Sequence, residues 1–221
     1  MNGFVNLRSI DCFQNFQNYT KVIDFSGLTN IEDYGTGFLS GCTGLKTVLF
    51  GNNSKVRRFG QCFLYECREL YTIDLSSFTG VEIVEKLFMY KCHSIEELDF
   101  SFCSETLEFI DAFFASCCGL KKINFGQKEF KKLTVVKENF INACFSKLKK
   151  IDLSQFINIR SFKTNSCLYG LVDEINLSNF RSLGQFENLS HIHAEKIIIN
   201  KDADYEFKKE IKKCANIIEE I

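Results

Sequence analysis

The sequence contains no proline and no tryptophan, only three histidines, and almost no net charge. A chain of 221 residues without proline lacks the stiff turns and linkers that usually separate domains, so we predict a single folded unit. A formal net charge of −1 excludes the basic surface of a general nucleic-acid-binding protein. No apolar run approaches the ~20 residues that a membrane-spanning helix needs, so we expect no membrane span.

The N-terminal segment, MNGFVNLRSIDCFQNF, has no basic stretch that leads into an apolar one. We therefore expect no signal peptide and a cytoplasmic location, with the cell surface as the alternative. The 11 cysteines are odd in number, and four of them occupy one position of the repeat described below. This pattern favours buried free thiols in a reducing compartment over a disulfide scaffold.

Catalytic motifs are scarce. The sequence has no phosphate-binding loop, no nucleophile elbow and no HExxH pattern, so we predict a protein that is not an enzyme and needs no cofactor. His191 and His193 lie on one face of an extended segment and could bind zinc if Cys214 supplied a third ligand. A solvated histidine pair is the favoured interpretation, so we predict no metal site.

A repeat of about 25 residues runs through most of the chain. Its clearest copies read FLSGCTGLKTVLFG, FLYECRELYTIDLSSF and FMYKCHSIEELDFSFC. Four positions recur with a spacing of 25 residues. The first is Phe, at residues 13, 38, 63, 88 and 113, and the second is Cys, at residues 42, 67, 92 and 117. The other two are the apolar residues of an I-D-L-type segment, at residues 23, 48, 73, 98 and 123 and at residues 25, 50, 75, 100 and 125. Looser copies follow in IDLSQF, INLSNF and KIIIN, which makes about eight copies.

Each copy predicts two short strands joined by a corner. I-D-L alternates inward and outward as a strand does, and Ser or Gly follows as a turn signal. A second apolar pair with i, i+3 spacing comes next, for example Val81 and Val84. One copy cannot bury its own apolar face, but stacked copies can, so we predict a repeat solenoid of short parallel β-strands.

The frame F-x-x-x-C-x-x-L-x-x-I-x-L followed by V-x-x-I resembles the BspA-type leucine-rich repeats of bacterial surface proteins and many protist proteins. The resemblance covers most of the chain, except that family repeats commonly carry proline after the first strand and this chain has Ser or Gly there. It implies a leucine-rich-repeat-like scaffold for binding or adhesion, usually without catalysis.

We expect a dedicated cap at only one end of the stack. We predict the solenoid over residues 1–200 and a capping helix over residues 201–221, because the apolar residues there follow 4, 3, 4, 3 spacing: Phe207, Ile211, Cys214, Ile218 and Ile221. No comparable cap precedes the first copy, in which Leu7, Ile10 and Phe13 are already in frame. Either the polar run QNFQNYT caps the first turn, or the N-terminal repeat makes an end-on contact with another copy of the chain, which is a second expectation.

The candidate binding residues are the outward-facing ones. In the second strand position Ile83, Phe109 and Val135 stand where other copies have Asp33, Arg58, Ser161 and Gln185, which predicts an apolar patch with Phe109 as its anchor. In the first strand position Asp74 and Asp99 belong to an outward-facing strip of aspartates. We favour the interpretation that each carboxylate accepts backbone hydrogen bonds at the following turn, and an acidic surface for a basic partner is the alternative.

These features together predict a non-catalytic scaffold that binds another protein. The alternatives are a BspA-like adhesin displayed on the cell surface, and a subunit or bound factor of a large macromolecular assembly.

The cytoplasmic expectation is tested by counting thiols. In denaturant without reductant, we expect all 11 cysteines to react with a thiol reagent, as they do after reduction. A count that rises on reduction would reveal disulfides and favour the cell-surface alternative.

Overall fold

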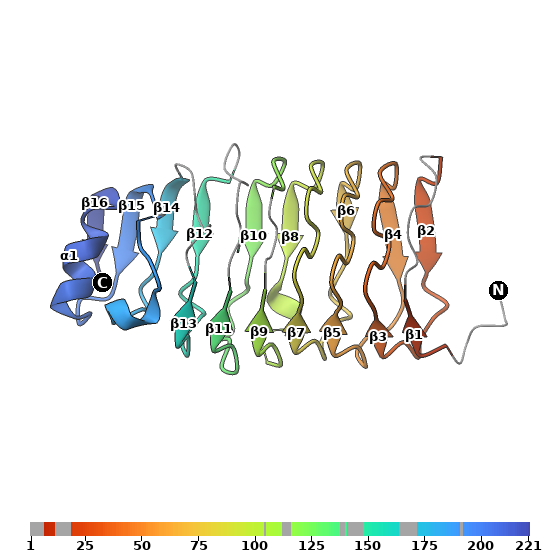
Figure 1. The fold of residues 1–221 in the computed structure, drawn as a ribbon, viewed down its shortest axis with the longest axis horizontal. Helices are drawn as coiled ribbons and strands as arrows, with labels where there is room; N and C mark the ends of the chain where they lie inside the picture. The colour runs from red at the N-terminus through yellow and green to blue at the C-terminus, as the bar shows by residue number, and fades with distance from the viewer. Residues whose placement is uncertain are drawn as a thin grey trace.

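The computed structural model describes residues 7–11, 19–103, 105–111, 116–137, 140, 148–163, 172–190 and 192–221, with only the backbone described for Phe109. Over these residues the chain is a parallel-strand β-solenoid of about seven turns with a period of about 24 residues and a single C-terminal helix. The turns stack along one axis, so the first and last turns lie at opposite ends of an elongated body (Figure 1). The predicted solenoid is thus confirmed.

One side of the solenoid is a seven-stranded parallel sheet, called sheet A here, in which each turn contributes a strand of only two residues. Its strands in order are β1 (Ser9–Ile10), β3 (Asp33–Tyr34), β5 (Arg58–Phe59), β7 (Ile83–Val84), β9 (Phe109–Ile110), β11 (Val135–Val136) and β13 (Ser161–Phe162). After β13, Phe186 adds only an isolated bridge to Phe162, so sheet A has no eighth strand among the described residues.

The opposite side, called face B here, carries three shorter parallel sheets in succession (Figure 1). They are formed by β2 (Val22–Phe25), β4 (Thr47–Phe50) and β6 (Thr72–Ile73); by β8 (Glu97–Asp99) and β10 (Lys122–Asn124); and by β12 (Lys150–Asp152), β14 (Val172–Asn176), β15 (Ala194–Ile199) and β16 (Ala215–Glu220). Two 3-10 turns, η1 (Ser101–Cys103) and η2 (Leu183–Gln185), lie between strands.

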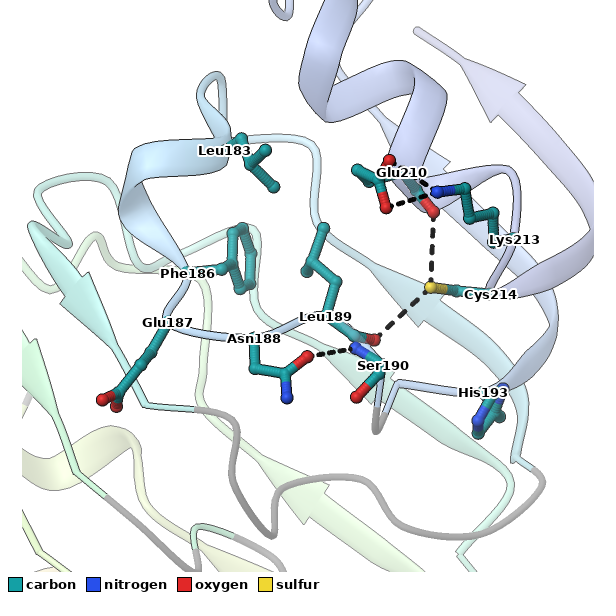
Figure 2. A pocket seen from close by; sticks show the side chains of 10 residues that line it. All are labelled: Leu183, Phe186, Glu187, Asn188, Leu189, Ser190, His193, Glu210, Lys213 and Cys214. Carbon is teal, nitrogen blue, oxygen red and sulfur yellow. Dashed lines mark hydrogen bonds and ion pairs between the residues drawn. The ribbon is translucent and has the colours of Figure 1, made fainter.

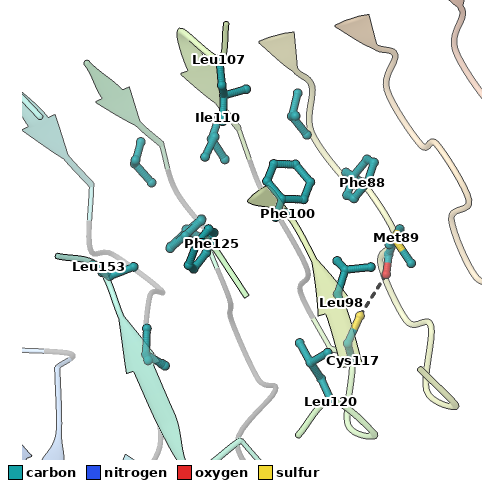
Figure 3. Packing of buried hydrophobic residues seen from close by; sticks show 14 of the residues in the cluster. Phe88, Met89, Leu98, Phe100, Leu107, Ile110, Cys117, Leu120, Phe125 and Leu153 are labelled. Carbon is teal, nitrogen blue, oxygen red and sulfur yellow. Dashed lines mark hydrogen bonds between the residues drawn. The ribbon is translucent and has the colours of Figure 1, made fainter. Parts of the chain in front are cut away.

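The core fills the space between sheet A and face B. Because neighbouring side chains on a strand point to opposite sides, each two-residue strand of sheet A gives one residue to the core and one to the surface. The inward residues form a fully buried column: Tyr34, Phe59, Val84, Ile110, Val136 and Phe162. Figure 3 shows Ile110 of this column with Phe88, Leu98, Phe100 and other residues of the same core.

The corner between β5 and β6, and its equivalents, explains the Phe and Cys positions of the repeat. Phe63 stacks on Phe38 with ring centroids 5.2 Å apart and on Phe88 at 5.4 Å. The Cys117 thiol donates to the Met89 carbonyl oxygen at 3.0 Å (Figure 3), and Cys67 and Cys92 make the same bond at 3.1 and 3.2 Å to the turn before. Both residue types therefore serve packing between turns.

The same corner needs backbone with positive φ at alternate residues. One turn meets this need with Gly37, Leu39 and Gly41, whereas later turns use residues that carry side chains: Cys62, Leu64, Glu66, Leu87, Met89, Lys91 and Ser116. Left-handed backbone costs an L-residue roughly 1–2 kcal/mol. Hydrogen bonds between turns hold the corner in place, such as Leu64 N–H to Phe38 O at 2.8 Å and Met89 N–H to Phe63 O at 2.8 Å.

One turn departs from the apolar pattern inside the core. Asn53 is fully buried where the next copy has Phe78, and it is the one buried polar residue of the described chain. The Tyr34 hydroxyl donates to its Oδ1 at 2.8 Å, and its Nδ2 donates to the Gly51 carbonyl at 2.9 Å. Burial raises the pKa of Tyr34, so the hydroxyl stays protonated and remains a donor.

The C-terminal end differs from the sequence-based expectation. The helix α1 covers only Tyr205–Ile211, and residues Ala215–Glu220 form strand β16, parallel to β15. The predicted helix over 201–221 is therefore too long. Ile218 pairs with Ile197 in the ladder instead of continuing a helical stripe. Pairing with β15 holds residues 215–220 as a strand, although their local apolar spacing also fits a helix.

Ser116 provides a test of the corner geometry, because its φ is 61° and the same position of an earlier turn is Gly41. We expect Ser116→Gly to raise the free energy of unfolding by about 0.5–1 kcal/mol, since glycine removes the steric cost but adds flexibility. Urea denaturation measures the change. Ser94→Gly, two residues after the corner cysteine and without positive φ, is the control and should lower stability. Equal losses in both variants would contradict the corner geometry.

Candidate protein-binding surface on sheet A

The outer side of sheet A carries one residue from each strand. Ladder pairing joins Arg58 to Ile83, Ile83 to Phe109, Phe109 to Val135 and Val135 to Ser161. The three apolar candidates therefore occupy three adjacent strands, at a spacing of about 4.8 Å per strand. We call Ile83, Phe109 and Val135 the apolar column.

Two members of the apolar column are described with their side chains. Ile83 is 38% exposed and Val135 is partly exposed, whereas their inward neighbours Val84 and Val136 are fully buried. The side chain of Phe109 lies outside the described residues, although its backbone is paired on both sides. The column thus faces away from the core at both of the positions where exposure is described.

A charged bridge adjoins the apolar column at β5. Arg58 donates to both carboxylate oxygens of Asp33, from Nε at 3.1 Å and Nη2 at 2.9 Å, and from Nη1 to Glu85 at 3.0 Å. The bond to Asp33, together with the nearby charge of Glu85, raises the pKa of Arg58. The second oxygen of Glu85 accepts the Gln61 N–H at 2.9 Å. Opposite charges 25 residues apart, at Asp33 and Arg58, are the sequence signal that could have indicated this bridge.

Further charges flank the other strands of the column. Glu108, just before Phe109, lies 3.8 Å from the Lys132 ammonium, and Asp111 lies 3.8 Å from that of Lys137. Exposed pairs of this kind contribute little stability, roughly 0–1 kcal/mol each. An apolar centre with a polar, charged rim is the usual composition of a protein-binding site.

The aspartate strip lies elsewhere, on the outer side of face B. Each carboxylate accepts the N–H two residues later: Asp24 from Ser26 at 2.8 Å, and Asp74 from Ser76 at 2.8 Å. The same bond recurs at Asp99, Asn124, Asp152 and Asn176. The strip therefore closes a turn after each strand, which is the interpretation that the sequence favoured.

Asp99 has a further partner along the strip. Asn124 Nδ2 donates to its second carboxylate oxygen at 2.7 Å. Burial opposes ionisation of Asp99, but the hydrogen bonds from Ser101 and Asn124 outweigh it and lower the pKa. Leu49 interrupts the strip between Asp24 and Asp74, so the aspartates form no continuous acidic surface.

The suggested zinc ligands are only partly described, because His191 lies outside the described residues. Among the residues that the structure does describe, no three His, Cys, Asp or Glu side chains gather as a metal site. The Cys214 thiol is 5% exposed and points to the carbonyl oxygens of Leu189 at 3.4 Å and Glu210 at 3.6 Å (Figure 2). Burial raises its pKa, which keeps it a weak nucleophile.

Cys214 and His193 border a cavity of about 460 Å³ between α1 and the loop after η2 (Figure 2). Leu183, Phe186 and Leu189 supply apolar lining, and the charged Glu210 there is paired with Lys213 at 2.6 Å.

A second set of exposed apolar side chains was missed from the sequence. Val22 and Tyr71 are each 56% exposed and Leu49 is 44% exposed, all on face B near the first turn. Comparison within the repeat would have found them: Val22 stands where β4 and β6 have Thr47 and Thr72.

A structural role of the aspartate strip predicts unequal effects at Asp74. Asp74→Asn should leave the free energy of unfolding nearly unchanged, because Asn124 and Asn176 already make this turn bond in the native chain. Asp74→Ala should lower it by about 1 kcal/mol through loss of that bond. Urea denaturation of both variants at neutral pH is the measurement. Equal losses of stability would contradict the turn-closing role, and loss of partner binding in Asp74→Asn would instead support an acidic binding surface.

None of the helices in the described part of the chain is long and apolar enough to cross a membrane. No family model matches the chain, and neither the curated proteins nor the solved structures contain a match.

Proposed function

We propose that the chain is a non-catalytic scaffold that binds a protein partner through the outer side of sheet A. The observation that carries the proposal is the exposure of Ile83 beside a partly exposed Val135, two strands apart in one ladder. Solvated polar residues occupy the same position at Asp33, Arg58 and Ser161.

Physical chemistry supports a partner at this position. An apolar side chain on the outer side of a two-residue strand gains nothing from the core, because the inward neighbour already fills it. Covering the column removes apolar surface from water, at about 25 cal/mol per Å². The Arg58 bridge and the pairs of Glu108 and Asp111 surround the column with charges that can orient a partner without being buried.

The framework suits binding because it is stiff. The described turns are bonded to their neighbours through sheet A, and many of them also through the corner or one of the sheets of face B, so neighbouring turns hold the column in place. Phe109 is the proposed anchor, since aromatic residues dominate binding energies at the centres of interfaces. The resemblance to BspA-type repeats supports a binding role. We propose a cytoplasmic partner because Cys67, Cys92 and Cys103 are buried free thiols.

The test is a comparison of two aspartate substitutions with similar starting exposure. Ile83→Asp changes the apolar column on sheet A, and Leu49→Asp changes an exposed leucine on face B. A partner isolated with the wild-type chain is purified, and its dissociation constant is measured by calorimetry for each variant. We expect Ile83→Asp to weaken binding at least about tenfold, as at a typical interface centre, and Leu49→Asp to leave it within about twofold.

Circular dichroism and urea denaturation serve as folding controls for both variants. Unchanged binding by Ile83→Asp, or equal loss in both variants, would contradict the assignment of the partner to sheet A.

A further inference from the structure

The two ends of the solenoid are closed unequally. At the C-terminal end α1 packs against η2, and Phe207 stacks on Phe186 with ring centroids 5.4 Å apart. The helix therefore covers the end of the stack on the side of sheet A, where Phe186 bridges to β13. On face B the last element is the six-residue strand β16 (Figure 1).

The outer edge of β16 has no backbone partner among the described residues. Ile221 uses both its backbone groups toward β15, donating to Ile199 O at 3.1 Å and accepting from Lys201 N at 2.9 Å. Alternate residues of a strand face opposite edges, so the N–H and C=O groups of Ile218 and Glu220 point outward. An edge of this length is a template for pairing with another chain.

The N-terminal end presents the complementary edge on the same face. β2 pairs with β4 on one side only, and no other strand in the described part of the chain lies beyond it. Val22 of β2 is 56% exposed, and its inward neighbour Ile23 is only half-buried. All the paired strands of face B are parallel, so β2 has the direction that a further strand beside β16 would need.

The residues at the two ends match by position in the ladder. One outward column of face B begins and ends with an apolar residue and is polar between: Val22, Thr47, Thr72, Glu97, Lys122, Lys150, Glu174, Lys196, Ile217. Ile217 is 51% exposed. The neighbouring inward column begins with Ile23 and ends with Ile218, and both are half-buried while the members between them are mostly buried.

We propose that two copies of the chain associate head to tail, with β2 of one copy added in parallel to β16 of the other. The junction extends the ladder of face B, while α1 covers the side of sheet A. It places Val22 against Ile217 and Ile23 against Ile218, and it supplies backbone hydrogen bonds to the outer edges of β2 and β16, which have no partner strand among the described residues. Because the two surfaces differ, each dimer keeps one free end of each kind and can add further copies.

The charges at the junction set its salt dependence. In the proposed register Asp24 follows Glu219 in the outward column, as Asp99 follows Asp74 within the chain. Glu219 is already paired with Lys196 at 2.7 Å, and Asp24 accepts the Ser26 N–H. The remaining repulsion is screened by salt, so association should tighten as the ionic strength rises.

The test uses variants that each carry a substitution at only one end of the solenoid. Val22→Asp adds a carboxylate beside Asp24 at the N-terminal edge, and Ile217→Asp adds one beside Glu219 at the C-terminal edge. Sedimentation velocity of the 221-residue chain measures association. We expect wild type to form concentration-dependent oligomers and each variant alone to associate at least about tenfold more weakly, because an apolar contact is replaced by like charges.

Mixing the two variants distinguishes head-to-tail contact from symmetric contact. The mixture should form a complex with one molecule of each variant, since it combines one intact end of each kind. Thr72→Asp, in the same column but inside the stack, is the control and should associate like wild type. Ile218→Pro, which removes an outward N–H of β16, is the second variant and should also abolish association.

Three results would overturn the proposal: a wild-type chain that stays monomeric at all concentrations, association of Val22→Asp equal to wild type, or a mixture no more associated than its components. Oligomers lost only in Ile217→Asp and Ile218→Pro would indicate symmetric pairing of two β16 strands and would likewise contradict it.

Discussion

The parallel ladder between successive turns is the interaction on which the rest of the structure depends. It requires each turn to return to the same place after about 24 residues, so that a residue lies directly on its counterpart from the turn before. Sheet A, the corner and face B are three such contacts around each turn. Side chains at the same position of successive turns consequently form a column, and the members of a column tend to share the same environment.

The columns help to distinguish residues that pack between turns from residues that are candidates for binding. Phe63 and Cys67 pack between turns, because Phe63 stacks on its counterpart one turn away and Cys67 donates a hydrogen bond to the turn before. A residue that breaks the character of its column needs another explanation. Asn53 breaks an apolar column, and a buried hydrogen bond from Tyr34 explains it. Ile83 is exposed in a column where Asp33 and Arg58 are polar, and we propose that a partner covers it.

The sequence predicted the solenoid and the composition of its core because the period is so regular between Phe38 and Phe88. It also predicted that Ile83 and Val135 face outward, since inward and outward positions alternate on a strand. The fate of residues 212–221 was not predictable in this way. Five apolar residues at 4, 3, 4, 3 spacing fit a helix, but the ladder offered by β15 favours a strand from Ala215 onward. Long-range pairing overrides a local pattern, and only the position of β15 in space reveals it.

The bridge from Arg58 to Asp33 and Glu85 was missed for a related reason. Asp33 and Arg58 share a column, but Glu85 comes from another position of the turn, and only the folded geometry brings it to the same guanidinium. The solvent exposure of the apolar side chains could not be predicted from the sequence either, because the sequence does not show which of them a neighbouring loop covers.

A crystal structure of the chain that shows the Phe109 side chain is the most direct test of the proposed binding surface on sheet A. We expect the Phe109 ring on the outer side of sheet A, between Ile83 and Val135 and open to solvent or to a bound partner. A ring that points into the core, or strands β7, β9 and β11 paired in a different register, would contradict it.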